Sequence, residues 1–189
     1  MIKIYVLDNG GQWTHREWRV LRELGVSTEI KRNDVPIEDL QDADGLVLSG
    51  GAATIEYETF KLGKTGEYLE KMNIPILGIC AGAQFMGLYY GGKVGRANVP
   101  EFGKVKVAIL EKDELFKDLP NEIIAWESHN DEIKELPVNF KLLASSESCR
   151  VQAFGDPAKR RYGLQFHPEV EHTQYGRKIF QNFIDLCGT

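Results

Sequence analysis

The sequence predicts an α/β fold, with a mostly parallel central sheet, helices on both faces and antiparallel strands in the C-terminal half. In the first half of the chain, short apolar runs alternate with segments of helical periodicity, as in βαβ units. In the second half, short apolar runs follow one another with tight connections, which favours antiparallel strands. A length of 189 residues suits one domain with a sizeable core, and we expect residues 1–189 to form it.

The expected elements follow in order from these patterns. The first helix has apolar residues on one face and stops at Gly25, and the helix after Cys80 stops at Gly91 and Gly92. The expected helices cover residues 12–24, 60–72, 84–90 and 175–186, with one helical turn at 36–40. The expected strands cover residues 2–7, 26–30, 45–48, the run that enters Cys80, 105–110, 123–126, 140–144, 151–154 and 162–166.

Composition narrows the possible classes of function. The 23 Lys and Arg against 28 Asp and Glu give a net charge of −5 without a basic stripe, which argues against nucleic acid as the main partner. The three cysteines are far apart with no Cys-x-x-Cys pair, so neither a disulfide framework nor a zinc site is predicted. The N-terminus enters a strand without a basic leader, and no apolar run has the length of a membrane span, so we expect a cytoplasmic protein. We expect the short basic run at 159–161 to be a solvated turn.

The most informative stretch is an apolar run that enters a cysteine flanked by two glycines. Gly78 and Gly82 stand two residues before and after Cys80, which is a thiol version of the Gly-x-Ser-x-Gly nucleophile elbow. Because glycine has no Cβ, a strand and a helix can pack closely around a strained backbone there. A thiol at a helix N-terminus is favoured as the reactive thiolate. The alternative for Cys80 alone is a buried structural cysteine.

A second stretch ends another expected strand and carries a histidine and a carboxylate. His167 and Glu169 are two residues apart, and the alternation of an extended segment would put both side chains on one side. A nucleophilic thiol needs a base, and the base needs an orienting group. His167 alone would be interpreted as a hydrogen-bonded structural histidine, but with Cys80 and Glu169 it predicts a Cys-His-Glu triad.

The stretches at residues 78–84 and 166–169 resemble the class I glutamine amidotransferases of the triad type, and the resemblance covers nearly the whole chain. It implies a flavodoxin-like sheet and the hydrolysis of L-glutamine to glutamate and ammonia through a thioester on Cys80. His167 would be the base, with Glu169 as its orienting group. The resemblance implies no cofactor and no metal in this chain.

The resemblance also assigns the other site residues. The backbone N–H groups of Gly51 and Ala81 would form the oxyanion hole, Ala81 because it follows the nucleophile of the elbow. Gln84, Ser128 and His129 would bind the substrate. The residues alone leave alternatives open, namely a plain glycine turn at Gly51, an ordinary helix residue at Gln84, and a second candidate base at His129.

Three further segments, at residues 7–12, 126–131 and 166–183, resemble the family members that supply ammonia for the amination of XMP to GMP with ATP. The chain stops at Thr189 without a Ser-Gly-Gly-rich pyrophosphatase loop, so we expect a separate glutaminase subunit. The implied partner is an ATP pyrophosphatase and XMP-binding synthase subunit, which would hold the ATP and the Mg²⁺. We expect it to dock near the mouth of the site, against His15, Arg16, Arg19, Glu171 and His172.

One position departs from the family pattern. Ala52 stands where the family usually has proline after two glycines, so we expect a less rigid oxyanion loop, low activity alone and stimulation by the partner. The rival interpretations are the glutaminase of anthranilate or carbamoyl phosphate synthesis, a free-standing γ-glutamyl hydrolase, and a non-catalytic binding module of the same fold.

Overall fold

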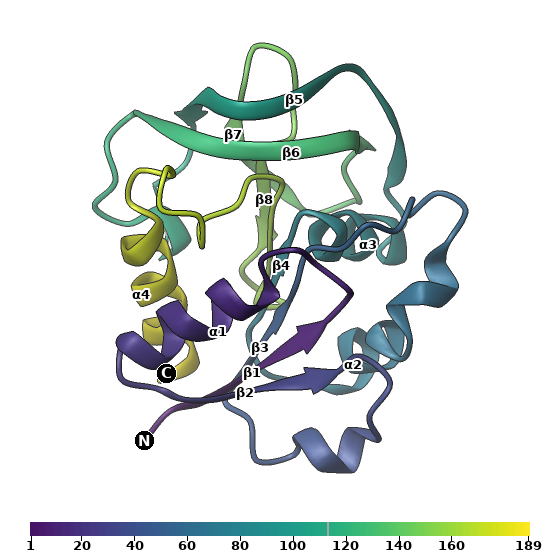
Figure 1. Cartoon of the computed structure of the whole chain (residues 1–189), viewed down its shortest axis with the longest axis vertical. Coiled ribbons are helices and arrows are strands. Elements are labelled where there is room, and N and C mark those ends of the chain that lie inside the picture. Colours follow the sequence, from purple (N-terminus) through teal and green to yellow (C-terminus); the bar gives the residue numbers. More distant parts are fainter. Residues whose placement is uncertain (113) are drawn as a thin grey trace.

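A computed structural model of the chain describes residues 1–112 and 114–189. Within these residues the chain forms a nine-stranded sheet with the order β2-β1-β3-β4-β9-β8-β7-β5-β6 (Figure 1). The strands are β1 (Lys3–Asp8), β2 (Ser27–Arg32), β3 (Gly45–Leu48), β4 (Ile76–Ile79), β5 (Lys93–Ile109), β6 (Glu122–Glu135), β7 (Lys141–Ser145), β8 (Ala153–Asp156) and β9 (Arg161–Leu164).

The sheet confirms the predicted fold class. Strands β2, β1, β3, β4 and β9 pair in parallel, and β8, β7, β5 and β6 continue the sheet with antiparallel pairs. The strand predicted at 162–166 differs from the expectation, because β9 pairs in parallel with β4 and only its other edge is antiparallel, against β8. Local sequence indicates that a strand exists, but tertiary packing decides which partner lies on each edge.

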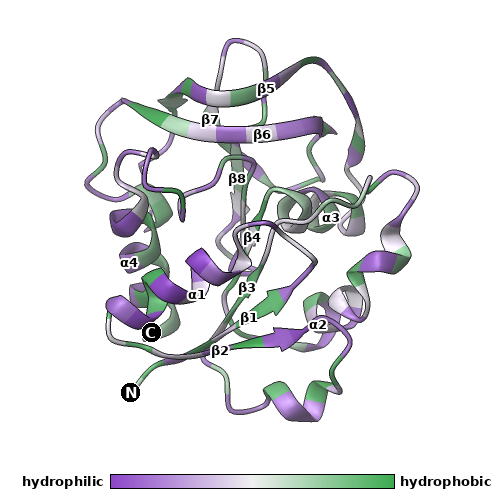
Figure 2. Cartoon of the chain, in the orientation of Figure 1, coloured by the Kyte–Doolittle hydropathy of each residue, from purple (hydrophilic) through white to green (hydrophobic). Residues whose placement is uncertain are grey.

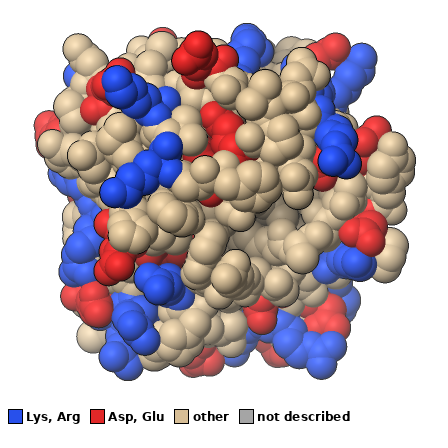
Figure 3. All heavy atoms as spheres, turned by 45° about the horizontal axis from the view of Figure 1, so that its top comes forward, with Lys and Arg blue, Asp and Glu red and all other residues tan. Residues whose placement is uncertain are grey.

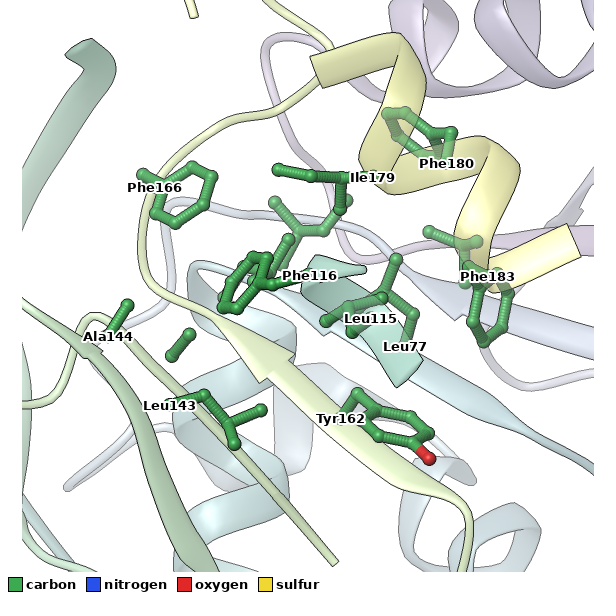
Figure 4. Close-up of a cluster of buried hydrophobic side chains, with 14 of the residues drawn as sticks. Leu77, Leu115, Phe116, Leu143, Ala144, Tyr162, Phe166, Ile179, Phe180 and Phe183 are labelled. Carbon is green, nitrogen blue, oxygen red and sulfur yellow. The ribbon is translucent and has the colours of Figure 1, made fainter. Parts of the chain in front are cut away.

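The helices cover both faces of the sheet, as predicted. In β1, Ile4 and Val6 belong to the core beneath α1 and α4, and Tyr5 and Leu7 belong to the core beneath α2 and α3. Figure 4 shows the first core, where Phe180 and Phe183 of α4 lie over the sheet. The helices are α1 (Thr14–Glu23), α2 (Thr65–Lys71), α3 (Ala81–Tyr89) and α4 (Gly176–Cys187), and short 3-10 turns occur at η1 (Ile37–Leu40), η2 (Thr59–Leu62) and η3 (Glu114–Phe116).

The predicted short strands at 105–110 and 123–126 are parts of a much longer antiparallel pair, β5 and β6. The register shifts between Arg96 and Glu101, so the two strands form a bent ribbon at one edge of the sheet. Figure 2 shows polar and apolar residues mixed along both strands. Buried positions alternate along β6, but Glu127 and His129 occupy two of them, so the strand lacks the apolar alternation from which strands are predicted.

Two local predictions also need correction. The helix expected at 60–72 is divided into η2 and α2 by Gly63, whose φ of 54° an ordinary helix does not allow. The basic run at 159–161 is not wholly solvated, because Arg161 is only 4% exposed. Its guanidinium donates to the carbonyl oxygens of Leu69 and Met72, which are orphan acceptors at the end of α2.

The surface carries mixed charge. Acidic and basic side chains are interspersed over the face shown in Figure 3. Both termini lie close together on one side of the sheet in Figure 1. Within the described residues, no helix combines the length and apolar character that a membrane crossing requires.

Candidate active site

A cavity of about 560 Å³ opens where several strands end. It is lined by residues 10–14 after β1, residues 50–54 after β3, residues 128–131 of β6, and the side chains of Cys80, His167 and Glu169. In parallel sheets, ligands bind outside the carboxyl ends of the strands, so the position of the cavity agrees with the fold. Residues that are far apart in sequence meet here because β1, β3, β4 and β9 are neighbours in the sheet.

Cys80 forms the sharp turn between β4 and α3 that the sequence predicted. Its φ of 50° and ψ of −109° are an uncommon conformation for a residue with a side chain. A Cβ on Gly82 would lie 2.4 Å from the carbonyl oxygen of Leu48, so only glycine fits the close contact between α3 and β3. The N–H of Cys80 donates to the carbonyl oxygen of Leu164 at 2.7 Å, which fixes the turn against the end of β9.

His167 and Glu169 are brought together by a turn and not by an extended strand. β9 ends at Leu164, and the chain then bends, so the expected alternation does not explain why the two side chains meet. Nδ1 of His167 nevertheless lies 2.5 Å from Oε1 of Glu169. The backbone is anchored on both sides, because the His167 N–H donates to Trp126 and the Thr173 hydroxyl donates to the His167 carbonyl oxygen at 2.6 Å.

The histidine pair and the cysteine converge at Gly50. A Cβ on Gly50 would lie 3.3 Å from Cε1 of His167 and 3.5 Å from Cβ of Cys80. Burial by itself lowers the pKa of His167, but the Glu169 carboxylate and the Cys80 sulfur outweigh burial, so the pKa is raised well above its ordinary value. Because Glu169 engages Nδ1, the other ring nitrogen of His167 is left for the thiol. The three side chains of the predicted Cys-His-Glu triad are therefore brought together in one place.

Two backbone N–H groups beside Cys80 are available to an oxyanion. Ala81 is the first residue of α3, where the helix offers its N–H no acceptor. Gly51 follows β3, and neither its N–H nor that of Ala81 forms a hydrogen bond within residues 1–112 and 114–189. A Cβ on Gly51 would lie 2.3 Å from the carbonyl oxygen of Asn9, so the loop requires glycine there.

The loop after β3 is anchored although Ala52 replaces the usual proline. The Asn9 side-chain amide donates to the Ser49 carbonyl oxygen at 2.9 Å, and the Asn9 N–H donates to the Ser49 hydroxyl at 2.8 Å. That hydroxyl in turn donates to the Gly50 carbonyl oxygen at 2.8 Å. These hydrogen bonds hold the loop after β3 to the loop after β1, while the effect of Ala52 on the rigidity of the loop stays a prediction.

The other three predicted site residues lie at the cavity, with different surroundings. The Gln84 amide donates to the Asp131 carbonyl oxygen at 3.0 Å and to Gln165 at 3.1 Å, so it links α3 to β6. The Ser128 carbonyl oxygen is 3.9 Å from the Cys80 sulfur. Both ring nitrogens of His129 are engaged, by Glu101 and by the Asp131 carbonyl, which argues against His129 as a base for Cys80.

A buried polar network behind β6 was not predicted. Nε2 of His129 lies 2.7 Å from Glu101, whose carboxylate also accepts from Gln152 at 2.8 Å and from Ser146 at 2.7 Å. Glu101, His129 and Cys149 offer three ligand atoms within 4.8 Å of one another, a set that could hold a metal ion. The existing hydrogen bonds occupy the two best ligands of that set, and burial raises the pKa of the Cys149 thiol well above its ordinary range. The group therefore fits a structural network better than a metal site.

Sequence reasoning also missed Glu17, which lines the cavity from α1 and is 1% exposed. A signal was present, because Glu17 stands three residues after Thr14 and four before Leu21, in the buried stripe of the helix.

The remaining two histidines do not line the cavity. His15 and His172 are exposed and lie with their ring centroids 5.0 Å from those of Trp18 and Trp126.

Comparison with known proteins gives one consistent family. The glutamine amidotransferase class-I family model matches residues 5–186. The glutamine-hydrolysing GMP synthase subunit of Thermoplasma acidophilum is 58% identical over 189 residues, which cover 100% of this chain and 94% of that protein. The protein of the same name from Pyrococcus abyssi is 47% identical over 187 residues, with 98% of each chain covered.

Solved structures agree with the fold. The crystal structure of the GMP synthase subunit from Thermoplasma acidophilum superposes with a TM-score of 0.95 at 58% identity, covering 100% of this chain and 94% of that one. A glutamine amidotransferase of Thermotoga maritima superposes with a TM-score of 0.77 at 22% identity, covering 97% of this chain and 81% of that one. At such low identity the second likeness concerns the fold alone.

Proposed function

Since the chain belongs to the class I glutamine amidotransferases, we propose that it is the glutaminase subunit of a two-subunit GMP synthase. It hydrolyses glutamine and passes the ammonia to a synthase subunit that aminates XMP to GMP with ATP. The observation that carries the chemistry is the convergence of Cys80, His167 and Glu169 in one cavity. The role as a GMP synthase subunit is supported by relatives of that name that are 58% and 47% identical over nearly their whole length.

The proposed reaction begins at the Cys80 sulfur. His167 takes the thiol proton, and the thiolate attacks the side-chain amide carbon of glutamine, so that a C–S bond forms and the carbonyl oxygen becomes an oxyanion. The N–H groups of Gly51 and Ala81 stabilise that oxyanion. His167 then gives its proton to the amide nitrogen, the C–N bond breaks, and ammonia leaves behind a thioester.

Hydrolysis of the thioester completes the cycle. Water attacks the thioester carbon while His167 takes one of its protons, and the C–S bond breaks as that proton returns to sulfur. The products are glutamate and a free thiol. Throughout, Glu169 holds the Nδ1 proton of His167, which fixes the ring so that its other nitrogen faces the sulfur, and it stabilises the charged imidazolium.

Substrate binding is proposed for the residues that line the cavity around the sulfur. Gln84 and the backbone at Ser128 border the space beside Cys80. The side chain of His129 is only 1% exposed, so we assign it a different part, in which it holds residues 128–131 in place from behind. ATP, Mg²⁺ and XMP belong to the synthase partner in this proposal.

The test is glutamate release from glutamine by the purified protein, alone and with an ATP pyrophosphatase subunit, XMP, ATP and Mg²⁺. Release that rises when that subunit is added, with GMP formed, supports the whole proposal. Release that ignores the subunit keeps the chemistry and rejects GMP synthesis, in favour of another synthase or a free hydrolase. No release under either condition would leave a binding module. Cys80→Ser is the control, and it must not impair GMP formation from free ammonia.

The docking surface is proposed at the mouth of the site. Five polar residues near it are all exposed: His15, Arg16, Arg19, Glu171 and His172. Charge reversal at Arg19 should weaken association with the synthase subunit but leave glutamine hydrolysis by the isolated chain unchanged. Binding measured by titration calorimetry checks this, and unchanged affinity would move the docking surface elsewhere.

A further inference from the structure

The side-chain amide of Gln165 lies against the sulfur of Cys80. Its nitrogen Nε2 is 3.6 Å from Sγ, and an amide nitrogen can only donate a hydrogen bond, so the sulfur is the acceptor. Gln165 follows the last residue of β9 and is only 2% exposed. The proposed reaction assigns no part to this buried amide, although the amide contacts the nucleophilic atom itself.

The orientation of the Gln165 amide follows from the partners of its two ends. The carbonyl oxygen of Asp131 can only accept, so the Gln84 nitrogen, which lies 3.0 Å from it, must be the donor. The same nitrogen lies 3.1 Å from Oε1 of Gln165. The oxygen of Gln165 is therefore turned toward Gln84, and its NH2 group is directed at the sulfur of Cys80.

The backbone holds Gln165 in this place from both sides. Its own N–H donates to the carbonyl oxygen of Gln152 at 2.8 Å, and the carbonyl oxygen of the preceding Leu164 accepts from the Cys80 N–H at 2.7 Å. A buried amide is costly unless its polar atoms are hydrogen-bonded. Gln84 satisfies the oxygen of Gln165 and the sulfur satisfies its nitrogen, so the donor is in position before any substrate binds.

Two hydrogen-bonding neighbours of the sulfur favour different charge states. The Ser128 carbonyl oxygen, 3.9 Å away, can only accept, so it suits the neutral thiol, whose S–H is a donor. The Gln165 amide can only donate toward the sulfur, so it suits the thiolate. A hydrogen bond made to the charged form of a group favours that form, and the thiolate is the nucleophile. The amide therefore acts in the direction that catalysis requires.

We propose that Gln165 is a further catalytic residue, whose amide donates a hydrogen bond to the Cys80 sulfur whenever that sulfur carries negative charge. This occurs twice in each cycle. The thiolate forms when His167 takes the thiol proton, and an electron pair returns to the sulfur when water has attacked the thioester and the C–S bond breaks. Gln84 is the positioning residue that keeps the amide turned toward the sulfur. The inference rests on the proposed function, because it assigns Gln165 to the same glutaminase site.

The test is the rate at which iodoacetamide alkylates Cys80 as a function of pH, since the thiolate is the reactive form. Gln165→Met keeps a similar length but has no donor, so the midpoint of its alkylation profile should rise by about one pH unit, as expected for one lost hydrogen bond to a charged group. Below the midpoint the variant should react about tenfold more slowly, whereas at high pH the two rates should agree within about threefold. An unchanged midpoint would overturn the proposal.

Gln152→Met is the matched control. Gln152 is also fully buried, and its amide donates to Glu101 and Ser146. Its loss should lower the unfolding free energy and leave the alkylation midpoint of Cys80 unchanged. An equal rise of the midpoint in both variants would mean that the loss of any buried amide loosens the cavity, and the proposal would be wrong. Peptide mapping identifies the alkylated site among the three free cysteines.

The other groups that act on the sulfur remain in place in Gln165→Met and in its control. They are His167 from the turn after β9, Glu17 from α1 and Glu127 from β6, together with Glu169, which engages His167. The difference between the alkylation profiles of wild type and Gln165→Met therefore isolates the contribution of the amide.

Gln84→Met tests the same contact without changing Gln165. It removes the donor that holds Oε1 of Gln165, so the midpoint should rise in the same direction as in Gln165→Met but by less. The double variant should have the midpoint of Gln165→Met, because Gln84 acts on the sulfur only through Gln165. Full additivity of the two shifts would contradict this. If Gln165→Met does not fold, Gln84→Met decides the question, and an unchanged midpoint in it overturns the proposal.

Turnover provides a second readout. In Gln165→Met, kcat for glutamine hydrolysis should fall by about tenfold to a hundredfold and KM should change little, because the amide contacts the sulfur and not the substrate. The loss should shrink as the pH rises and the thiol ionises without help. A loss of kcat that is the same at every pH would indicate a merely structural role and would count against the proposal.

The outcomes separate this inference from the proposed function. If wild type released no glutamate with any synthase subunit, the proposed function would fail, while the alkylation profiles would still decide whether Gln165 stabilises the thiolate. If wild type is active and Gln165→Met shares its alkylation midpoint, the proposed function stands and the role of Gln165 falls.

Discussion

Two buried histidine–glutamate pairs flank the same cavity, and they differ in what the second ring nitrogen contacts. His167 lies 2.5 Å from Glu169, and His129 lies 2.7 Å from Glu101. The Cys80 sulfur acts on His167 and helps to raise the pKa of its imidazole, whereas the other nitrogen of His129 is closed off by the Asp131 carbonyl. A histidine beside a carboxylate is therefore no catalytic pair by itself, because catalysis also requires an unoccupied nitrogen directed at the nucleophile.

The carboxyl groups of the two pairs, Glu101 and Glu169, also differ in how many hydrogen bonds they form. Glu101 accepts hydrogen bonds from Ser146 and Gln152 and lies 2.7 Å from Nε2 of His129, so both of its oxygens are engaged. Glu169 is engaged by His167 through one oxygen, and its other oxygen has no hydrogen-bond partner in the described part of the chain. We expect the first pair to contribute mainly to stability and the second mainly to turnover.

The largest expected effect separates the two histidines. His167→Asn should lower kcat for glutamine hydrolysis by roughly 10³-fold or more, because it removes the proposed base, while the fold persists. His129→Asn should leave the base in place and destabilise the protein by about 2–3 kcal/mol, because it leaves Glu101 poorly paired. Steady-state kinetics and urea unfolding of both variants check this. Loss of turnover in His129→Asn without loss of stability would reverse the assignment.

A smaller effect is expected at Gly51, the proposed oxyanion donor in the loop after β3. Gly51→Ala would bring its Cβ to 2.3 Å from the Asn9 carbonyl oxygen, so the loop must shift and its N–H leaves the proposed position. Removing one oxyanion donor costs roughly 10²-fold in kcat. Gly95→Ala is the control, since its Cβ would meet nothing closer than 3.7 Å. Wild-type kcat in Gly51→Ala would rule out this donor.

The structural pair can be weakened without touching the catalytic one. Glu101→Gln replaces a carboxyl group that contacts Ser146, Gln152 and His129 through two oxygens with an amide that has one acceptor oxygen, so the unfolding free energy should fall by about 2 kcal/mol. The measurement is chemical denaturation at neutral pH. Glutamine turnover below the melting transition should change by less than about threefold. A large drop in turnover would show that the network is coupled to the triad.

The smallest effect is expected at Glu127, which lies 3.5 Å from His129 and is fully buried. Burial and the charge of Glu101 raise its pKa well above the ordinary value of 4.5. Below pH 4.5 the carboxyl group is protonated in the folded and the unfolded state, so Glu127→Gln should change stability by less than about 0.5 kcal/mol there. Wild type should lose stability relative to the variant as the pH rises from 4.5 to the folded-state pKa, because the unfolded chain releases this proton first. Parallel stability curves for the two proteins above pH 4.5 would mean that the pKa of folded Glu127 is not raised.

Local patterns in the sequence were sufficient to predict the residues of the first pair, His167 and Glu169, and the cysteine beside them. The glycines around Cys80 predict the elbow because the close contacts that require them involve adjacent elements. The pair of His167 and Glu169 was predicted for a wrong geometric reason, since a turn joins them and not a strand. The class of fold also followed from local patterns.

The second pair, His129 and Glu101, could not be predicted, because it depends on contacts between segments that are distant in sequence. Glu101 and His129 meet because β5 and β6 form a long ribbon whose exposed faces give little apolar pattern. Glu17 stands in the buried stripe of α1, but Glu169, which lines the same cavity, lies on a turn more than a hundred residues away. No local pattern contains such a pair, so it becomes visible only when the sheet order is known.

The backbone at Cys80 has a consequence for how this protein would evolve in the laboratory. Holding a residue with a side chain at a φ of 50° costs about 1–3 kcal/mol, whereas glycine adopts that conformation without strain. A screen of random variants for heat resistance alone would therefore enrich Cys80→Gly, which has lost the sulfur. Selection for stability would favour glycine at position 80, whereas selection for turnover requires cysteine. Variants selected for thermostability must therefore be screened for activity in every round.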